Sequence, residues 1–308
     1  MQKGITMVHG RPRSWKSLAV LALAVSASLN QPIFGNARFK AEGPLRCVYM
    51  TEEDSRNLVA ARLRWLIAGH YAQAPDSLWL SARRGLSLEA AESQAQIHDV
   101  VTSLSPDMLI FDTGRAFAPS VDKGPADAAP TIRFLRALLA ETCLRSLLIV
   151  HHDTKPARDG KDERARSERS SGGILLSAAD CPIGFERLSD RAALVVPDRY
   201  KVSADPAPFR LDFESATPAG DSFKEWLRVK ASDESSSDPA DVRDLALQER
   251  VLIYLRDNPG SAGNAVAKGL RAGKQAVLGA LGALAEAGKV DSVGEKRKTS
   301  WFVHGSQP

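Results

Sequence analysis

The sequence contains few cysteines and no long hydrophobic run. Its three cysteines, Cys47, Cys143 and Cys181, lie far apart, without C-x-x-C spacing. This usage argues against a disulfide framework and indicates reduced, buried thiols in a cytoplasmic protein. The longest apolar run, residues 18–29, is shorter than the roughly 20 residues that a bilayer-spanning helix needs. No cleavage pattern follows a short charged start, so we expect neither membrane insertion nor export.

Aromatic residues are also scarce, at 6% of the 308 positions, whereas 44% are hydrophobic and 25% are charged. This balance is typical of a globular protein with one large and one small domain, and it excludes collagen, coiled coil and wholesale disorder. The 41 Lys and Arg residues against 37 Asp and Glu residues give a net charge of +4. That mild basic excess permits a nucleic-acid partner without requiring one.

Short apolar runs rich in β-branched residues alternate with longer helical stretches through most of the chain. This alternation is typical of a parallel sheet with crossover helices. We expect strands at residues 5–9, 46–51, 107–112, 146–151, 181–186 and 193–197, and a late edge strand at 209–213. We expect helices at residues 16–28, 55–69, 88–104 and 129–141. The sequence therefore predicts an α/β domain over residues 1–228.

The last part of the chain has a different pattern. Residues 229–243 lose apolar periodicity and fill with Ser, Asp and Pro, which predicts a flexible linker. Helices are then expected at 245–256, 264–270 and 274–287, followed by a hairpin of residues 290–293 and 299–303. Three helices and a two-stranded wing predict a small α+β winged-helix domain over residues 244–308.

A near match to the Walker A pattern follows the first expected strand and opens the first expected helix. It consists of Gly10, Arg11, Pro12, Arg13, Ser14, Trp15, Lys16 and Ser17, followed by Leu18. In such a loop, backbone N–H groups surround phosphate oxygens, Lys16 would bridge the β- and γ-phosphates of ATP, and Ser17 would hold Mg²⁺. Trp15 stands where the pattern has its second glycine. A chance match is the alternative interpretation.

Acidic residues close two other expected strands. Asp112 ends the apolar segment 109–112, the Walker B form, and would orient Mg²⁺ or else cap a helix. Glu52 and Glu53 follow the second strand, where a carboxylate could polarise an attacking water. Glu53 is our choice for this general base and Glu52 the alternative, while a capping role at a helix N-terminus is the competing interpretation.

Two histidines, His151 and His152, close the fourth expected strand. One imidazole could report on the γ-phosphate, although a buried structural histidine is the alternative. Zinc is disfavoured because no second Cys/His pair has ligand spacing. Two stretches of low periodicity, 116–127 and 153–171, follow the third and fourth strands at the sheet edge where α/β proteins bind ligands.

With these motifs in place, the chain resembles the RecA-like AAA ATPases of plasmid and phage replication, the RepA-type hexameric helicases related to the DnaB-type helicases. The resemblance spans residues 5–214 and is carried by segments 10–17, 48–55, 109–112, 150–155, 169–173 and 178–180. It implies a RecA-like P-loop NTPase domain with a mainly parallel central sheet and an ATP- and Mg²⁺-dependent motor. It further implies a homo-oligomeric, hexameric ring with single-stranded DNA in its channel. Such families carry a Lys-x-Arg arginine finger, and Arg199 of Pro-Asp-Arg takes that place here without the Lys.

Two basic regions are candidate DNA contacts. In RecA-like motors the segment after the fourth strand tracks single-stranded DNA, and its cations here are Lys155, Arg158, Lys161, Arg164, Arg166 and Arg169. A solvated, flexible loop is the alternative. In the winged helix, Lys274 would begin the recognition helix, and Lys296, Arg297 and Lys298 lie in the wing. These four residues would contact duplex DNA, although a replication protein is an alternative partner.

The sequence therefore predicts an ATP-hydrolysing RecA-fold DNA motor of the replicative-helicase type. One alternative is an ATP-gated DNA-binding or loading protein with weak or no hydrolysis, which Trp15 and Pro197 favour. A second is a transcriptional regulator whose ATPase domain sets only its oligomeric state.

Overall fold

The computed structural model describes residues 3–70, 73–153, 173–197, 207–216, 225–232, 239–270, 272–294 and 299–305. The chain divides into two compact units. The first comprises Met1–Arg187 and Arg191–Ser235, and the second comprises Leu188–Asp190 and Ser236–Pro308. Each unit is described by itself. In the described part of the chain, no helix combines the length and apolar character that crossing a membrane requires.

The first unit is built on a nine-stranded sheet with the strand order β3-β2-β4-β5-β1-β6-β7-β8-β9. The strands are β1 Gly4–Gly10, β2 Cys47–Thr51, β3 Leu78–Ala82, β4 Met108–Asp112, β5 Ser146–His152, β6 Cys181–Ser189, β7 Ala192–Pro197, β8 Phe209–Ala216 and β9 Trp226–Ala231. Each neighbouring pair from β3 to β6 in this order is parallel. The pairs β7–β8 and β8–β9 are antiparallel.

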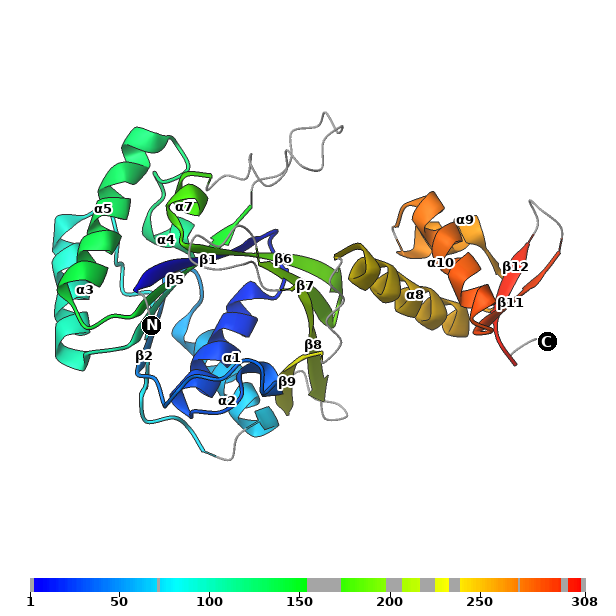
Figure 1. Ribbon diagram of the computed structural model, residues 1–308, viewed down its shortest axis with the longest axis horizontal. Helices are drawn as coiled ribbons and strands as arrows, with labels where there is room; N and C mark the ends of the chain where they lie inside the picture. The colour runs from blue at the N-terminus through cyan, green and yellow to red at the C-terminus, as the bar shows by residue number, and fades with distance from the viewer. Residues whose placement is uncertain are drawn as a thin grey trace. The chain divides into compact units, whose positions relative to one another are not determined.

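Helices cover both faces of this sheet, as Figure 1 shows. They are α1 Lys16–Ser28, α2 Arg56–His70, α3 Ala91–Leu104, α4 Gly114–Phe117, α5 Pro125–Glu141 and α7 Gly173–Ala178, together with the short 3-10 helix η1 Ile33–Gly35. One core joins the sheet to α1, α2 and η1, and the other joins it to α3, α4, α5 and α7. Alternate residues of β1 enter different cores, Val8 the first and Met7 the second, because successive strand residues point to opposite faces. The mainly parallel sheet between helices confirms the predicted α/β class.

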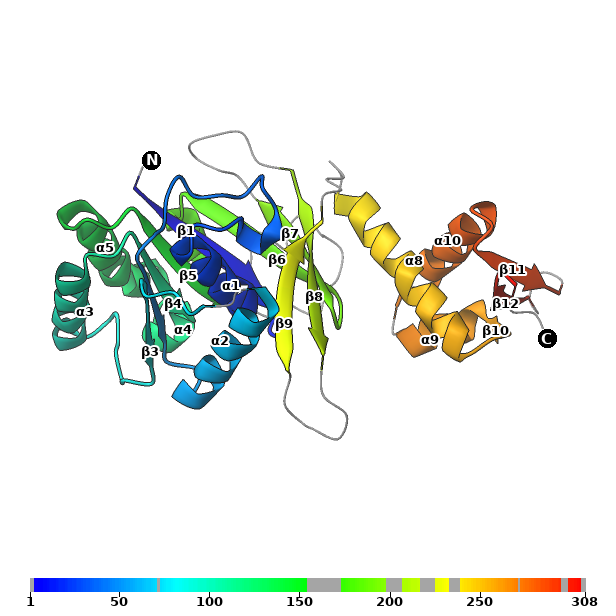
Figure 2. The same cartoon turned by 90° about the horizontal axis from the view of Figure 1, so that it is seen from below.

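Helix α1 is enclosed on nearly all sides. Every residue of it except Ser17 and Leu23 is buried, which explains why its sequence has no polar face. Phe213 of β8 and both Leu227 and Val229 of β9 belong to the same core as α1. Strand β9 also packs against α2, and Figure 2 shows the two side by side. The antiparallel strands therefore close the space around α1 on the side away from β5.

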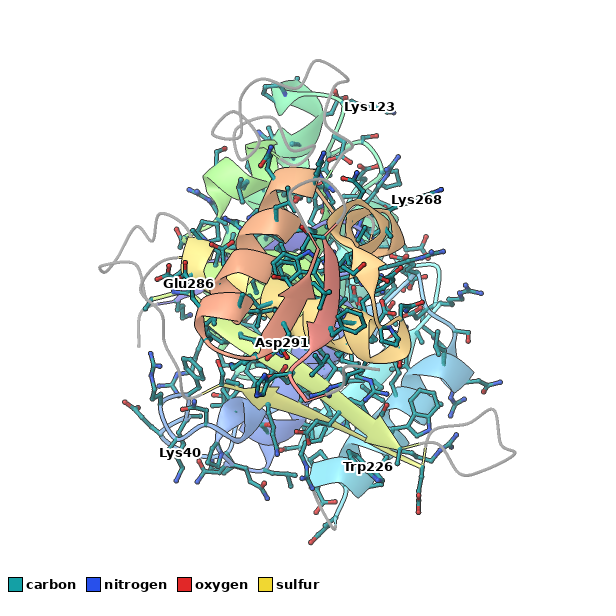
Figure 3. All side chains as sticks on the ribbon, turned by 90° about the vertical axis from the view of Figure 1, so that its right-hand side faces the viewer. Lys40, Lys123, Trp226, Lys268, Glu286 and Asp291 are labelled. Carbon is teal, nitrogen blue, oxygen red and sulfur yellow. The ribbon has the colours of Figure 1, made fainter. Side chains whose placement is uncertain are left out.

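The second unit contains three helices, α8 Pro239–Asp257, α9 Gly263–Leu270 and α10 Lys274–Glu286. They pack against a small antiparallel sheet of order β10-β12-β11, with β10 Ser261–Ala262, β11 Val290–Val293 and β12 Ser300–Val303. Val251, Val266 and Leu281 form its core with their neighbours. In Figure 3, α10 runs towards Glu286 and β11 carries Asp291.

The structure corrects the predicted elements at several points. Strands β3, β9 and β10 were not predicted, and β8 is not an edge strand because β9 pairs with it. The prediction of a linker over 229–243 is wrong at both ends: residues 229–231 belong to β9 and residues 239–243 to α8. Val229 is fully buried. The Ser-, Asp- and Pro-rich composition of the residues that follow it hid the end of a strand whose alternate residues, Leu227 and Val229, face the core.

Candidate functional site

The residues predicted for the nucleotide site gather where four neighbouring strands end. Strands β2, β4, β5 and β1 are parallel and adjacent, so their carboxyl ends share one edge of the sheet. The register pairs Thr51 with Asp112, and His9 with His151. The Walker-like loop therefore begins beside the two histidines of β5. Glu53 follows directly after the end of β2, which lies beside Asp112.

The loop after β1 wraps around the ammonium group of Lys16. Lys16 Nζ donates to the carbonyl oxygens of Gly10 and Arg11, both at 2.8 Å, and to Ser14 Oγ at 3.1 Å. Gly10 has a positive φ of 150°, and a Cβ there would lie 2.3 Å from the carbonyl oxygen of Phe185 in β6. Only glycine lets the chain leave β1 this close to β6. The loop thus holds a positive charge in a fixed backbone cradle.

Burial lowers the pKa of Lys16 to about 8. The negative charges of Asp153, Asp112 and Glu53 oppose this shift. Three carboxylates that follow or end three different strands thus favour the charged ammonium, but burial outweighs them and makes the charge easier to lose than that of an ordinary lysine. An anion bound beside Lys16 would favour the charged ammonium and raise its pKa.

Trp15 occupies the second glycine position of the motif in a left-handed conformation, with φ 70° and ψ 6°. It is the N-cap residue of α1, and its indole ring stacks on Phe213 at 4.9 Å between centroids and 20° between planes. A side chain other than glycine costs about 1–2 kcal/mol in this conformation, and the ring is accommodated against β8. Arg13 is also left-handed, at φ 63°. Pro12 and Arg13 are exposed, and Leu18 is buried.

Ser17 and Asp112, predicted from separate motifs, are in contact. Ser17 Oγ donates to Asp112 Oδ1 at 3.0 Å, and the Tyr49 hydroxyl donates to Asp112 Oδ2. Burial raises the pKa of the Asp112 carboxyl, while the two hydrogen bonds lower it. Thr113, not Asp112, is the N-cap residue of α4. The helix-cap interpretation of Asp112 is therefore wrong.

The two neighbouring glutamates have different roles. Glu52 accepts three backbone N–H groups, from Arg84 and Gly85 at 3.0 Å each and from Leu86 at 3.2 Å. Through these contacts it holds the turn after β3. Glu53 Oε2 instead accepts the Thr113 hydroxyl at 3.1 Å. The structure therefore distinguishes two residues that the sequence left as alternatives.

Glu53 also lies beside a histidine. His152 Nε2 is 3.5 Å from Glu53 Oε2, and this hydrogen-bonding contact is the main reason why the pKa of Glu53 is lowered. His151 is fully buried on the opposite face of β5, with Nε2 3.2 Å from Asp122 Oδ1. Asp122 belongs to the segment 116–127 predicted as a functional candidate. Of the two histidines, only His152 lies against the predicted base.

Some site residues were not predicted as such. Tyr49 and Asp153 lay inside the family-like segments but received no role, and His9 precedes the loop. His9 Nδ1 is 3.0 Å from Asp153 Oδ1, and the Asp153 backbone N–H donates to the Gly10 carbonyl at 3.1 Å. Burial would raise the pKa of Asp153, but the hydrogen bond with His9 and the charge of Lys16 outweigh it, and the pKa is lowered. A signal for this pair exists only in the register of β1 and β5.

Several predicted residues lie outside the described residues. They are Lys155, Arg158, Lys161, Arg164, Arg166, Arg169, Arg199, Lys296, Arg297 and Lys298. Lys274, in contrast, is the first residue of α10 and is exposed.

The donor set fits a nucleotide with Mg²⁺. The Ser17 hydroxyl and the Asp112 carboxylate are oxygen ligands of the kind that Mg²⁺ binds, and Lys16 supplies positive charge for phosphates. No group of three or more His, Cys, Asp or Glu side chains within the described residues could hold a metal ion by itself. Magnesium at this site would therefore need phosphate oxygens and water for the rest of its coordination, which is its usual behaviour in proteins.

Comparisons with known proteins give a matching family model and a similar solved structure. A family model described as an AAA domain matches residues 1–158, slightly more than half of the chain. Among solved structures, a KaiC-like protein from the hyperthermophilic archaeon Pyrococcus horikoshii OT3 is similar, with a TM-score of 0.47 and 10% sequence identity, over 74% of this chain and 89% of that chain. No curated protein matches the sequence. The matched region 1–158 contains the loop, both glutamates, Asp112 and both histidines.

Proposed function

This chain belongs to the AAA domain family, and on that premise we propose that it is an ATP-hydrolysing RecA-fold DNA motor of the RepA-type replicative-helicase kind. One observation carries the proposal: the Lys16 cradle, the Ser17–Asp112 pair and the Glu53 carboxylate meet at a single sheet edge, 3.0 Å separating the oxygens of the pair. The cradle and Ser17 follow β1, whereas Asp112 ends β4 and Glu53 follows β2. A loop that matched Walker A by chance would have no reason to lie beside the other two.

Each residue has a chemical task in this proposal. Lys16 stabilises negative charge on the β- and γ-phosphates, and α1 directs its N-terminus at them. Ser17 and Asp112 would hold Mg²⁺, which neutralises charge on the phosphate oxygens when it is bound. The lowered pKa of Glu53 keeps its carboxylate ionised at neutral pH, as a base requires.

The hydrolytic step follows from these positions. Glu53 accepts a proton from water while the water oxygen forms a bond to the γ-phosphorus. The bond between that phosphorus and the oxygen bridging to the β-phosphate breaks, and ADP and phosphate result. Thr113 and His152 both contact Oε2 of Glu53, at 3.1 and 3.5 Å, and so orient the carboxylate. His152 is therefore our choice for the residue that senses the γ-phosphate.

The DNA part of the proposal rests on the family resemblance and on the second unit. Three helices with a small antiparallel sheet are the components of a winged helix. Lys274 and Gln275 lie exposed in the first turn of α10, where a recognition helix contacts bases. We assign duplex DNA or a replication protein to this surface, and single-stranded DNA to the cations of segment 153–171. A hexameric ring with Arg199 acting on the neighbouring subunit completes the proposal.

Steady-state ATP hydrolysis with and without single-stranded DNA tests this function, with Lys16→Ala as the inactive control. We expect DNA to stimulate hydrolysis and Lys16→Ala to abolish it. Mass in solution with and without ATP tests the ring of about six subunits that the RepA-type resemblance implies. ATP binding without hydrolysis above the control would overturn the motor proposal and favour the ATP-gated DNA-binding or loading protein.

A further inference from the structure

We propose that Trp15 and Phe213 form an aromatic brace that holds the phosphate loop in its phosphate-binding conformation from the antiparallel side of the sheet. Both would be positioning residues, because they act on the nucleotide through the loop backbone. The proposal rests on the nucleotide binding proposed above. It adds a role to β8, a strand that carries none of the residues assigned to hydrolysis.

The first step concerns the backbone. Trp15 is left-handed, and its carbonyl oxygen accepts the first hydrogen bond of α1, from the Ala19 N–H at 2.9 Å. Lys16 is the next residue, so any change in the φ of Trp15 moves the ammonium and the N-terminus of α1 together. A tryptophan relaxes readily from this region unless its surroundings prevent it. Something outside the loop must therefore fix Trp15.

The second step identifies what fixes it. The Trp15 indole Nε1 is buried and has no hydrogen-bond partner among the residues that the structure describes. No polar contact of that atom therefore orients the ring, and apolar packing must do so. The stack on Phe213, with ring centroids 4.9 Å apart and planes at 20°, supplies it. Phe213 is itself 3% exposed and belongs to the core around α1, so it is a fixed partner.

The third step places the brace in the sheet. The phosphate loop is held at its start by Gly10, which lies against the backbone of β6. Its end is held by Trp15 against β8. Phe213 pairs with Val229 of β9, and β9 packs against α2. The conformation of the loop thus depends on strands whose own sequence shows no nucleotide-binding motif.

A matched pair of variants tests the brace. Phe213→Leu removes the stack on Trp15, whereas Phe209→Leu removes a similar aromatic contact on the same strand, between Phe209 and Phe39 at 4.8 Å. Both substitutions reduce apolar packing in the same core. We expect Phe213→Leu to weaken Mg-ATP binding about two- to tenfold beyond any effect of Phe209→Leu. Its effect should fall on KM and the dissociation constant rather than on kcat.

Hydrogen exchange without nucleotide provides a second measurement. In Phe213→Leu the amides of residues 13–19 should exchange faster than in Phe209→Leu. In a Trp15→Gly background, the added Phe213→Leu change should not alter the exchange rate of these amides further. If Phe213→Leu folds poorly, Trp15→Gly alone serves as the variant that lacks the stack. Equal exchange and equal affinity in the two leucine variants would overturn the brace. If Phe213→Leu shows the expected faster exchange but the wild-type protein binds no ATP, the proposed function is overturned instead.

Discussion

The parallel and antiparallel parts of the large sheet differ in what they contribute. Strands β2, β4, β5 and β1 end at one edge and bring Lys16, Asp112 and Glu53 together, because parallel strands place their carboxyl ends side by side. Strands β8 and β9 run antiparallel and carry buried apolar residues that enclose α1. Chemistry and support are thus separated within one sheet, and Trp15 is the contact between them. Substitutions in the two parts should therefore fail in different ways.

The largest effect is expected at the parallel edge. Glu53→Gln removes the base but keeps the shape of the side chain, so kcat for ATP hydrolysis should fall about 10²–10⁴-fold while ATP binding persists. Glu52→Gln is the matched control, because Glu52 holds the turn at 84–86 and should leave kcat within a few-fold of the wild type. If kcat stayed within a few-fold of the wild type in both variants, neither glutamate would be the base.

A smaller effect at the same edge is expected from Tyr49→Phe. The Tyr49 hydroxyl donates a hydrogen bond to Asp112 Oδ2 and so orients the carboxylate. Its loss should raise the Mg²⁺ concentration needed for half-maximal hydrolysis about 10–100-fold, the usual cost of removing such an orienting group. Tyr254→Phe, in α8 of the second unit, is the control. If the Mg²⁺ dependence of hydrolysis did not change, the result would contradict a role for Asp112 in binding Mg²⁺.

The antiparallel part should respond in stability instead. Val229→Ala, in β9, removes fully buried apolar surface and should lower the free energy of unfolding by about 2 kcal/mol. The neighbouring Lys230, whose side chain is exposed, should tolerate alanine within about 0.5 kcal/mol. Denaturant titration of both variants measures the difference. Equal, small effects would mean that residue 229 belongs to a linker after all.

The smallest effect concerns pH at the Lys16 cradle. Bound phosphates raise the pKa of Lys16 above its free value of about 8, so binding takes up a proton when the pH exceeds that value. The affinity for ATP should be at its maximum below about pH 8. Above that pH it should fall with rising pH, by no more than about tenfold per pH unit. Isothermal titration between pH 7 and 9.5 measures it. An affinity that does not change with pH would contradict the buried, easily deprotonated ammonium. Lys16→Arg is the control, and its affinity should not change with pH because arginine stays protonated in this range.

The parts of the site that lie close in sequence were predictable. The spacing from Gly10 to Ser17 predicted the phosphate loop, and an apolar strand ending in Asp112 predicted its partner. The sequence favoured Glu53 over Glu52 as the base but showed no contact that separates them, and it left His151 and His152 as equal alternatives. Neighbouring residues at a strand end point in different directions, and a linear pattern does not say which one faces the site.

The sequence by itself determined the α/β class, the α1 boundaries and the identity of the chemical groups, because periodicity and spacing are local properties of the chain. Only the tertiary structure decided that β9 forms the last strand of the sheet, that Glu52 holds a turn and that Trp15 can stand in a glycine position. Each of these depends on a partner far away in sequence: Val229 on the core around α1, Glu52 on residues 84–86, and Trp15 on Phe213. Contacts of that range are set by packing, which no local pattern encodes.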